Sequence, residues 1–340
     1  MTFRSLKRLS VLDQSTASKG KSQDHAIRET IELAKHCEKL GFNRYWVSEH
    51  HNSGNIVGTA PEVLMAAIAA TTNRIRVGSA GVMLPHYSSL KVAEQFRVLE
   101  AIAPGRIDLG IGRAPGSDQL TARALNPYPQ DVNDEFPRQV DELRSWVCDL
   151  PLPDAHPFRK IHAHPTGPTC PEMWILGSSN YGAQLAAYFG LPYAFAYFFS
   201  DGFGVEQALD IYRKSYRPSE RFPEPIATIC VWALAADTEE EALFLYKTRE
   251  RSGIDREYGV RMPLVSPEEA ASRVFSSADQ LIAEKLKRKA IVGNSQQVSQ
   301  QLIALAGKLD LEELVIVTWT FAPEARRRSY ELLSKEFNLV

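Results

Sequence analysis

Three ionisable side chains follow one another at the end of a short apolar segment. The segment RYWVS is followed directly by Glu49, His50 and His51. Alternate residues of a strand point to opposite faces, so Glu49 and His51 would share a side that His50 does not. Histidine titrates near neutral pH, which makes His50 a candidate acid or base. The alternative is a histidine that only hydrogen-bonds at the end of a strand.

Two other segments carry groups that bind anions. GIGRAPG places Arg113 just after an apolar run, and the fork of donors on arginine suits a phosphate. GSSN places Gly177, Ser178 and Ser179 where a helix begins, and backbone N–H groups with hydroxyls hold anions at such a point. The plainer alternatives are a salt bridge for Arg113 and an ordinary serine helix cap. GIGRAPG lacks the lysine of a P-loop.

Two further segments differ in what they would offer a ligand. VGSAGVM has small residues from Gly78 to Gly81, which would let a planar ring lie against the backbone; tight packing is the alternative. AFAYFFS carries Phe195 and the run Tyr197–Phe199. We expect these aromatic rings in the core, with an apolar substrate wall as the alternative.

A metal site is not expected. Adjacent histidines such as His50 and His51 chelate one ion poorly, and no HExxH spacing occurs. Three more histidines, His156, His162 and His164, lie in a proline-rich stretch, where surface histidines are common.

Apolar stretches alternate with helical periodicity along most of the chain. Eight stretches are predicted to be strands: Leu9–Ser15, Arg44–His50, Arg76–Met83, Ile107–Gly112, Glu172–Gly177, Tyr193–Phe199, Ala227–Ala235 and Glu313–Thr320. Helices are predicted to follow them at Asp24–Leu40, Pro61–Ala70, Leu90–Ala103, Asn133–Leu150, Tyr181–Phe189, Val205–Tyr216, Thr238–Arg251 and Pro323–Phe337, with two more near Asp279–Lys289 and at Ser295–Leu309.

This alternation predicts an α/β fold with a parallel sheet, and eight strands close a (β/α)8 TIM barrel. We expect one domain over residues 1–340, with insertions after strand four and between strands seven and eight. A doubly wound open sheet is the alternative, although no GxGxxG follows the first strand. In a barrel the carboxyl ends of the strands converge, so the polar groups above would line one pocket.

Composition restricts the class of protein. The chain has 340 residues, 44% of them hydrophobic, and a formal charge of −2, which argues against nucleic acid or a membrane surface as partner. No stretch approaches the ~20 apolar residues of a spanning helix, and the first residues do not resemble a signal peptide. The scattered cysteines Cys37, Cys148, Cys170 and Cys230 predict free thiols in a cytoplasmic protein and no disulfide framework.

Four segments together resemble the bacterial luciferase-like flavin monooxygenase family. They are LSVLDQS, RYWVSEHH, RVGSAGVMLPHYSSLKVAEQFRVLEAIAPGRIDLGIGRAPGSD and MWILGSSNYGAQLAAYFGLPYAF. The resemblance covers nearly the whole chain and is strongest over residues 9–125 and 172–200. It implies a barrel that binds FMN at the carboxyl ends of its strands. It also implies that a separate NAD(P)H-dependent reductase supplies reduced flavin, and that O2 is used to oxygenate a small organic substrate.

The resemblance implies roles for the residues at strands two and three. His50 matches the histidine that acts as acid or base near the flavin, and Glu49 matches its acidic neighbour. Ala80 and Gly81 match the position where the family often has a non-proline cis peptide beside the flavin ring.

The resemblance also implies a phosphate site at strands four and five. Arg113 and Ser179 match phosphate-binding residues, and Gly177 and Ser178 belong to the same expected site. Luciferase has a glutamate in place of Ser178, so the contact made by that acid is not implied here. Luciferase also has a reactive cysteine in place of Gly112, so light emission is not implied.

The expected function is that of a two-component FMN-dependent monooxygenase. Alternatives are a flavin-binding protein without turnover, an enzyme that uses a deazaflavin coenzyme on the same fold, and a metal-dependent hydrolase. The aromatic sixth strand suggests an apolar or aromatic substrate. The resemblance further implies a homodimer and a mobile lid over residues 252–294.

Overall fold

The computed structural model describes residues 6–127, 132–200, 202–288 and 290–340, and it contains a closed parallel barrel. The hydrogen-bonded order is β6-β5-β4-β3-β2-β1-β9-β7, and β7 also pairs with β6, which closes the ring. An additional strand, β8, pairs with the far end of β7 outside this ring. The strands are β1 (Arg8–Asp13), β2 (Arg44–Val47), β3 (Arg76–Met83), β4 (Ile107–Gly112), β5 (Glu172–Gly177), β6 (Tyr193–Phe195), β7 (Ala227–Ala236), β8 (Ile291–Asn294) and β9 (Glu313–Val317).

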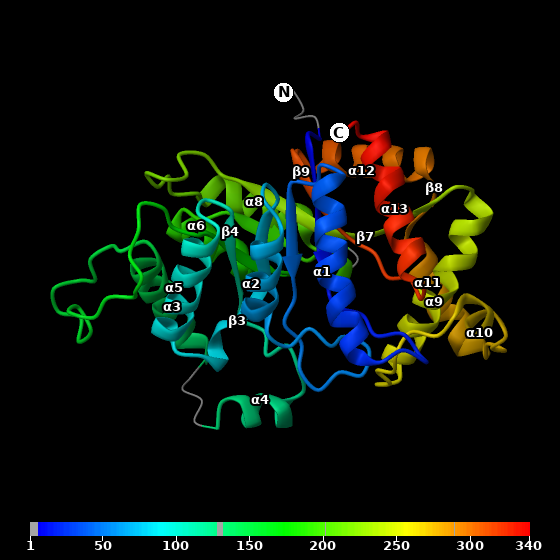
Figure 1. The fold of residues 1–340 in the computed structure, drawn as a ribbon, viewed down its shortest axis with the longest axis horizontal. Helices are drawn as coiled ribbons and strands as arrows, with labels where there is room; N and C mark the ends of the chain where they lie inside the picture. The colour runs from blue at the N-terminus through cyan, green and yellow to red at the C-terminus, as the bar shows by residue number, and fades with distance from the viewer. Residues whose placement is uncertain (1–5, 128–131, 201, 289) are drawn as a thin grey trace.

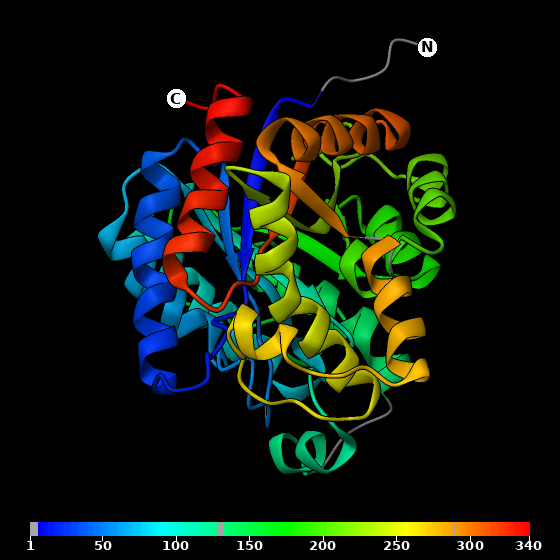
Figure 2. The ribbon, with the colours of Figure 1, turned by 90° about the vertical axis from the view of Figure 1, so that its right-hand side faces the viewer.

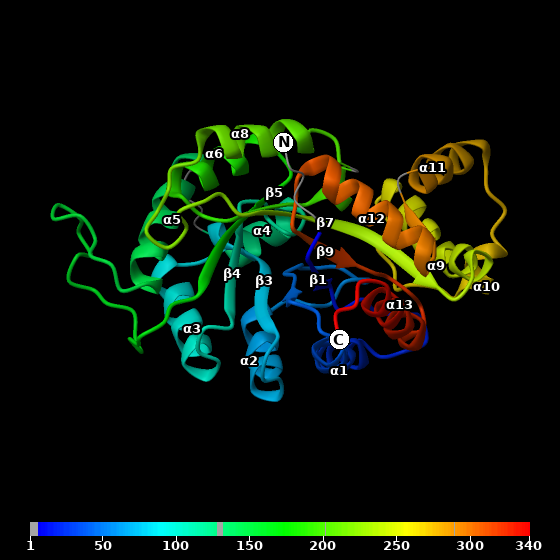
Figure 3. The ribbon, with the colours of Figure 1, turned by 90° about the horizontal axis from the view of Figure 1, so that it is seen from above.

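Helices surround the barrel and cover the outer faces of its strands (Figures 1 and 3). They are α1 (Gln23–Lys39), α2 (Pro61–Thr71), η1 (Leu84–His86), α3 (Ser89–Ile102), α4 (Gln119–Leu125), α5 (Val132–Val147), α6 (Asn180–Phe189), α7 (Tyr197–Ser200), α8 (Val205–Ser215), α9 (Glu239–Glu257), α10 (Pro267–Ala271), α11 (Ser277–Arg288), α12 (Ser295–Leu309) and α13 (Pro323–Glu336). With a helix on one face and the barrel interior on the other, every residue of β4 is buried. Such strands are apolar runs without alternation, as the sequence predicted.

The predicted (β/α)8 barrel is confirmed, and the two insertions lie where the sequence placed them. The connection after β4 holds α4, which lies below the barrel in Figure 1, and a long loop that projects from its side after α5. The connection from β7 to β9 holds α9, α10, α11 and β8, which lie on the right of Figure 1 and face the viewer in Figure 2.

One predicted strand is shorter than expected, and one observed strand was not predicted. The sixth strand was expected to reach Phe199, but it ends at Phe195, and the aromatic run that follows forms the short helix α7. Strand β8 was not predicted at all, because its four residues, IVGN, are too few to show a period. The predicted helix near Asp279–Lys289 is observed as α11, although Lys289 lies outside the described residues.

Buried charges fill the amino-terminal end of the barrel interior. Arg44 on β2 contacts Asp108 at 2.9 Å, Glu172 at 2.8 Å and Glu313 at 3.0 Å. Burial alone would lower the pKa of Arg44, but the three carboxylates outweigh it and raise that pKa. This cluster lies at the opposite end of the barrel from the carboxyl ends of the strands, so we assign it a structural role.

The prediction of four free cysteines was half wrong. Cys148 and Cys170 form a disulfide with their Cα atoms 5.2 Å apart, whereas Cys37 and Cys230 are free and buried. The bond joins the end of α5 to the start of β5, across the projecting loop. A separation of 22 residues along the chain carries no sign of this approach, because the loop between them has no periodicity.

No helix among the described residues is long and apolar enough to cross a membrane.

Candidate active site

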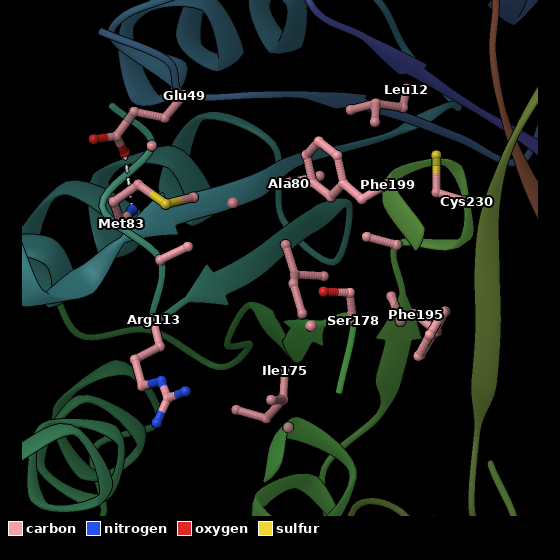
Figure 4. Close-up of a pocket in the computed structure, with 18 of the residues that line it drawn as sticks. Leu12, Glu49, Ala80, Met83, Arg113, Ile175, Ser178, Phe195, Phe199 and Cys230 are labelled. Carbon is pink, nitrogen blue, oxygen red and sulfur yellow. Dashed lines mark hydrogen bonds between the residues drawn. The ribbon is translucent and has the colours of Figure 1, made fainter. Parts of the chain in front are cut away.

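A pocket of about 290 Å³ opens at the carboxyl ends of the barrel strands. All eight residues predicted for the cofactor and the chemistry line it: Glu49, His50, Ala80, Gly81, Arg113, Gly177, Ser178 and Ser179. They come from four consecutive positions around the barrel, the ends of β2, β3, β4 and β5. Figure 4 shows Glu49, Met83 and Arg113 on one side of the pocket and Phe195, Phe199 and Cys230 on the other.

Arg113 lies beside the first turn of α6. Its guanidinium carbon is 4.2 Å from the centre of the Tyr181 ring, and Tyr181 is the second residue of that helix. Ser179 is the N-cap residue of α6, yet its side chain makes no capping hydrogen bond. The first N–H groups of a helix carry partial positive charge and need acceptors. The Arg113 guanidinium, a serine hydroxyl that makes no capping hydrogen bond and the N-terminus of α6 therefore lie at one end of the pocket.

An unsatisfied donor marks the same end. The hydroxyl of Tyr181 is buried and has no hydrogen-bond partner within the described structure. Buried polar groups are normally paired, and an exception in a pocket calls for a ligand or water. Phosphate oxygens fit a lining of one cation, hydroxyl donors and exposed helix N–H groups. Tyr181 was predicted only as the start of a helix, because a tyrosine at a helix start has no special signal.

Both carboxylate oxygens of Glu49 contact neighbouring protein groups. Its carboxylate accepts hydrogen bonds from the Tyr87 hydroxyl at 2.6 Å and from the backbone N–H of Met83 at 3.0 Å, and His51 Nε2 lies 2.8 Å away. Glu49 is 1% exposed. It joins the loop after β2 to the end of β3, so in this structure it shapes the pocket wall. His51 points to this carboxylate and is not among the pocket-lining residues.

His50, the next residue of the loop after β2, also lines the pocket. Its Nδ1 lies 3.1 Å from Ser48 Oγ, and its backbone N–H donates to Gly58. Burial lowers the pKa of His50 to about 4, with smaller contributions from the nearby charges of Arg261 and His51. The imidazole is therefore neutral at pH 7, and Nε2 is the nitrogen left to serve the pocket.

The peptide between Ala80 and Gly81 is cis, as the resemblance implied. A side chain on Gly81 would lie 2.5 Å from Leu176 Cδ1 and 2.8 Å from the Gly110 carbonyl oxygen, so only glycine fits there. Gly78 serves packing instead, because the Trp46 ring fills the space where its side chain would be. The small residues of β3 thus divide between the pocket and the barrel interior.

Aromatic and apolar side chains form the rest of the lining. Phe195, Phe198 and Phe199 contribute from β6 and α7, and Cys230 contributes from β7. Phe195 is fully buried, whereas Phe199 is 55% exposed at the pocket mouth. We expected these rings in the core and on a strand. The turn into α7 brings Phe198 and Phe199 to the pocket.

Several polar residues at a strand end or in the projecting loop lie outside the pocket. Asp13 at the end of β1 pairs with Arg326 at 3.0 Å, outside the pocket. The histidines of the projecting loop are apart from one another: His156 contacts Glu142, and His162 lies near Asp149. Among the described residues, no group of three or more His, Cys, Asp or Glu side chains gathers as metal ligands.

The segment expected to be a lid reaches the pocket only indirectly. Leu264 pairs with Ser18 after β1, and the carbonyl of Arg261 packs on Gly54 in the β2 loop. No described residue of 252–294 is among those that line the pocket. Within this segment Gly259 has a positive φ of +75°, whereas Gly253 is inside α9 and Gly293 is inside β8.

Comparison with known proteins identifies the family of this chain. The family model described as luciferase-like monooxygenase matches residues 8–310. A luciferase-like monooxygenase of Escherichia coli K12 is 38% identical over 323 residues, covering 95% of each chain. N-acetyl-S-alkylcysteine monooxygenase of Bacillus subtilis is 36% identical over 330 residues, covering 96% of this chain and 97% of that one. The crystal structure of apo-MsnO8 superposes with a TM-score of 0.89 at 35% identity and covers 98% of both chains.

More distant structures share the fold and bind two kinds of flavin-type cofactor. The oxygenating constituent of 3,6-diketocamphane monooxygenase, solved with FMN, has a TM-score of 0.69 at 18% identity. An F420-dependent secondary alcohol dehydrogenase has the same TM-score at 14% identity. The first covers 97% of both chains, and the second covers 96% of this chain and 98% of its own. With the family model matched over most of its length, this chain belongs to the luciferase-like monooxygenase family.

Proposed function

We propose that the protein is an FMN-dependent monooxygenase that receives reduced FMN from a separate NAD(P)H-dependent reductase. The observation that supports FMN most strongly is the anion-binding end of the pocket. There Arg113 stacks on Tyr181, Ser179 leaves its hydroxyl uncommitted, and the Tyr181 hydroxyl is buried without a partner. These groups would hold the phosphate that distinguishes FMN from riboflavin.

The other residues of the pocket suit a planar ring and a protected reaction. The backbone of Ala80 and Gly81 offers a surface without bulky side chains, on which the flavin ring would lie. Phe198 and Phe199 would exclude water from the space above it. When bound, reduced FMN supplies the electrons that activate O2.

His50 would manage protons in this reaction. Its imidazole is neutral at pH 7, so Nε2 is able to accept a proton from the bound reactants and return it later. Glu49 would act by position, since its hydrogen bonds to Tyr87 and Met83 fix the loop that carries His50.

The experiment combines binding with turnover. The purified protein is titrated with reduced FMN under argon, and then supplied with O2, a flavin reductase and a panel of organic substrates. N-acetyl-S-alkylcysteines head the panel because a relative is named for them. The proposal predicts tight binding of reduced FMN and substrate-dependent incorporation of oxygen. Absence of reduced-FMN binding overturns it, and binding without any O2-dependent product supports a flavin-binding protein instead.

A deazaflavin coenzyme is the second candidate, favoured by the F420-dependent structures that share the fold. The same titration decides between the two, since the reduced deazaflavin and reduced FMN are compared side by side. A higher affinity for the deazaflavin would replace FMN in the proposal while leaving the pocket residues in their roles.

A further inference from the structure

Gln14 is a buried polar residue on the apolar side of the pocket. It directly follows β1, is 2% exposed, and lines the pocket together with Leu12, which lies on that side in Figure 4. Asp13 between them points the other way and pairs with Arg326, as the alternation of a strand requires. The side chains that line the pocket from β6, α7 and β7 are Ala194, Phe195, Phe198, Phe199 and Cys230. Among these described residues, Gln14 carries the only side-chain N–H donors.

Trp319 fixes the orientation of the Gln14 carboxamide. The indole N–H of Trp319 donates to Gln14 Oε1 at 3.0 Å. An indole nitrogen only donates, so this bond identifies which end of the amide is the oxygen. It is also the only hydrogen bond of the Gln14 side chain within the described structure. Both N–H groups of Nε2 therefore lack a protein acceptor.

The nitrogen end of this amide is accessible to a ligand. Gln14 Nε2 is not among the fully shielded polar atoms that lack a partner, in contrast to the hydroxyl of Tyr181. Nε2 thus keeps contact with open space, and Gln14 borders the space of the pocket. An amide nitrogen that is desolvated without a partner costs free energy, which an acceptor on a bound molecule would recover.

Gln14 lies across the barrel from the anion-binding end of the pocket. In the ring of eight strands β1 is four places from β5, so its carboxyl end is opposite the start of α6. A ligand whose anionic group lies beside Arg113 would present an uncharged part to this side. One neutral donor on an apolar wall suits a neutral acceptor such as a carbonyl oxygen and fixes the orientation of the ligand. An anionic group buried there would have no cation beside it.

We propose that Gln14 Nε2 donates a hydrogen bond to a neutral carbonyl oxygen of the molecule that occupies the pocket. Two molecules carry such an oxygen: the flavin, whose pyrimidine edge has two carbonyl groups, and an organic substrate. Trp319 is a positioning residue, because it holds the amide in place. The identity of these ligands rests on the proposed function.

The first arm of the test measures the dissociation constants of reduced FMN and reduced riboflavin under argon. Gln14→Glu keeps an oxygen for Trp319 and replaces only the NH2 group. Gln139→Glu, on α5 and outside the pocket, adds the same charge as a control. If the flavin supplies the carbonyl oxygen, Gln14→Glu weakens both flavins at least ~10-fold and by the same factor, because they share the ring. Trp319→Phe should weaken both flavins to a smaller extent.

The second arm uses the protein saturated with reduced FMN and measures binding of 4-phenyl-2-butanone and of butylbenzene, which lacks the carbonyl group. If the substrate supplies the oxygen, Gln14→Glu weakens binding of the ketone several-fold and leaves butylbenzene unchanged, while Gln139→Glu changes neither. Unchanged affinities for both flavins and for the ketone in Gln14→Glu overturn the proposal. If the wild type binds no reduced flavin, the proposed function fails, and the second arm, run on the flavin-free protein, still decides the role of Gln14.

Discussion

The chemistry proposed for this protein depends most on the protonation state of one histidine. His50 lies on the pocket wall, and its desolvation lowers its pKa to about 4. An unperturbed histidine would be half protonated near pH 6.5 and mostly protonated at pH 6, so less of its neutral form would be available to accept a proton. The environment of His50 thus keeps the neutral form available throughout the physiological range.

We therefore predict that His50 titrates near pH 4 in the folded protein. NMR of 13C-labelled histidine, assigned by comparison with His50→Ala, measures this directly. Because the unfolded chain binds the proton more readily than the folded one, this residue's contribution to stability is complete above about pH 6.5. It is lost as the pH falls toward 4. A midpoint near 6.5 would contradict the assignment.

The same residue sets an expectation for turnover. His50→Ala should lower kcat by about 10²–10⁴-fold, the usual contribution of a general acid or base. Binding of reduced FMN should change little, since the phosphate end of the pocket is untouched. Measuring kcat and the reduced-FMN dissociation constant separately distinguishes this role from a structural one, in which both would change together.

At the scale of elements, the start of α6 departs from an ordinary capped helix. Among the described helices, five others have N-cap side chains that accept a backbone hydrogen bond: Ser88 for α3, Asp118 for α4, Thr238 for α9, Ser266 for α10 and Asn294 for α12. Ser179 does not, although its residue type suits the position. An N-cap serine that leaves the helix N–H groups uncapped is consistent with a ligand taking that place.

We predict that Ser179→Ala changes the free energy of unfolding by less than about 0.5 kcal/mol, because no capping bond is lost. Thr238→Ala, the matched control, should cost about 1 kcal/mol, because the Thr238 hydroxyl accepts from the Glu241 N–H at 3.1 Å. Ser179→Ala should weaken the binding of reduced FMN more than Thr238→Ala does. Urea denaturation and flavin titration of both variants supply the measurements, and a stability loss in Ser179→Ala equal to that of the control would show a structural cap.

Most elements were predictable because apolar runs and helical periods are local signals. The seven other barrel strands and the helices after them were found, whereas the end of β6 was not. The sequence AFAYFFS has strong β propensity, but after the bond from the Ala196 N–H to the Gly177 carbonyl of β5 the chain turns into α7. That bond depends on β5, which no local pattern of the sixth strand contains.

The site was predictable for a different reason: the barrel topology brings strand ends together. The eight predicted residues line one pocket because parallel strands share one carboxyl edge. Tyr181, Phe136 and Met83 were not singled out, because a tyrosine, a phenylalanine and a methionine on apolar faces have the pattern of core residues. Their roles in the pocket depend on which way each loop turns.

At the scale of the whole molecule, the barrel separates stability from chemistry. The charge cluster around Arg44 fills the amino-terminal end, and the pocket occupies the carboxyl end. We predict that Arg44→Met lowers the free energy of unfolding by about 3–5 kcal/mol, because it leaves the buried Asp108 and Glu313 and the half-buried Glu172 without the cation they share. Denaturant unfolding measures this.

The exposed pair of Arg28 with Asp24 supplies the control for that variant. Arg28→Met should have little effect, since exposed ion pairs contribute little to stability. Folded Arg44→Met protein should still bind reduced FMN with nearly wild-type affinity, because none of the four charged residues of the cluster lines the pocket. If both variants lost the same small amount of unfolding free energy, the cluster would contribute little to stability.

The central claim, that Arg113 and the start of α6 hold a flavin phosphate, is tested most directly by comparing reduced FMN with reduced riboflavin. Their dissociation constants are measured for the wild type, for Arg113→Ala and for Arg123→Ala, whose arginine lies on the exposed face of α4. We predict that the wild type and Arg123→Ala prefer FMN by at least ~10-fold, and that Arg113→Ala loses most of this preference while its riboflavin affinity stays unchanged. Equal affinity for FMN and riboflavin in the wild type, or a preference that Arg113→Ala retains, would contradict the account.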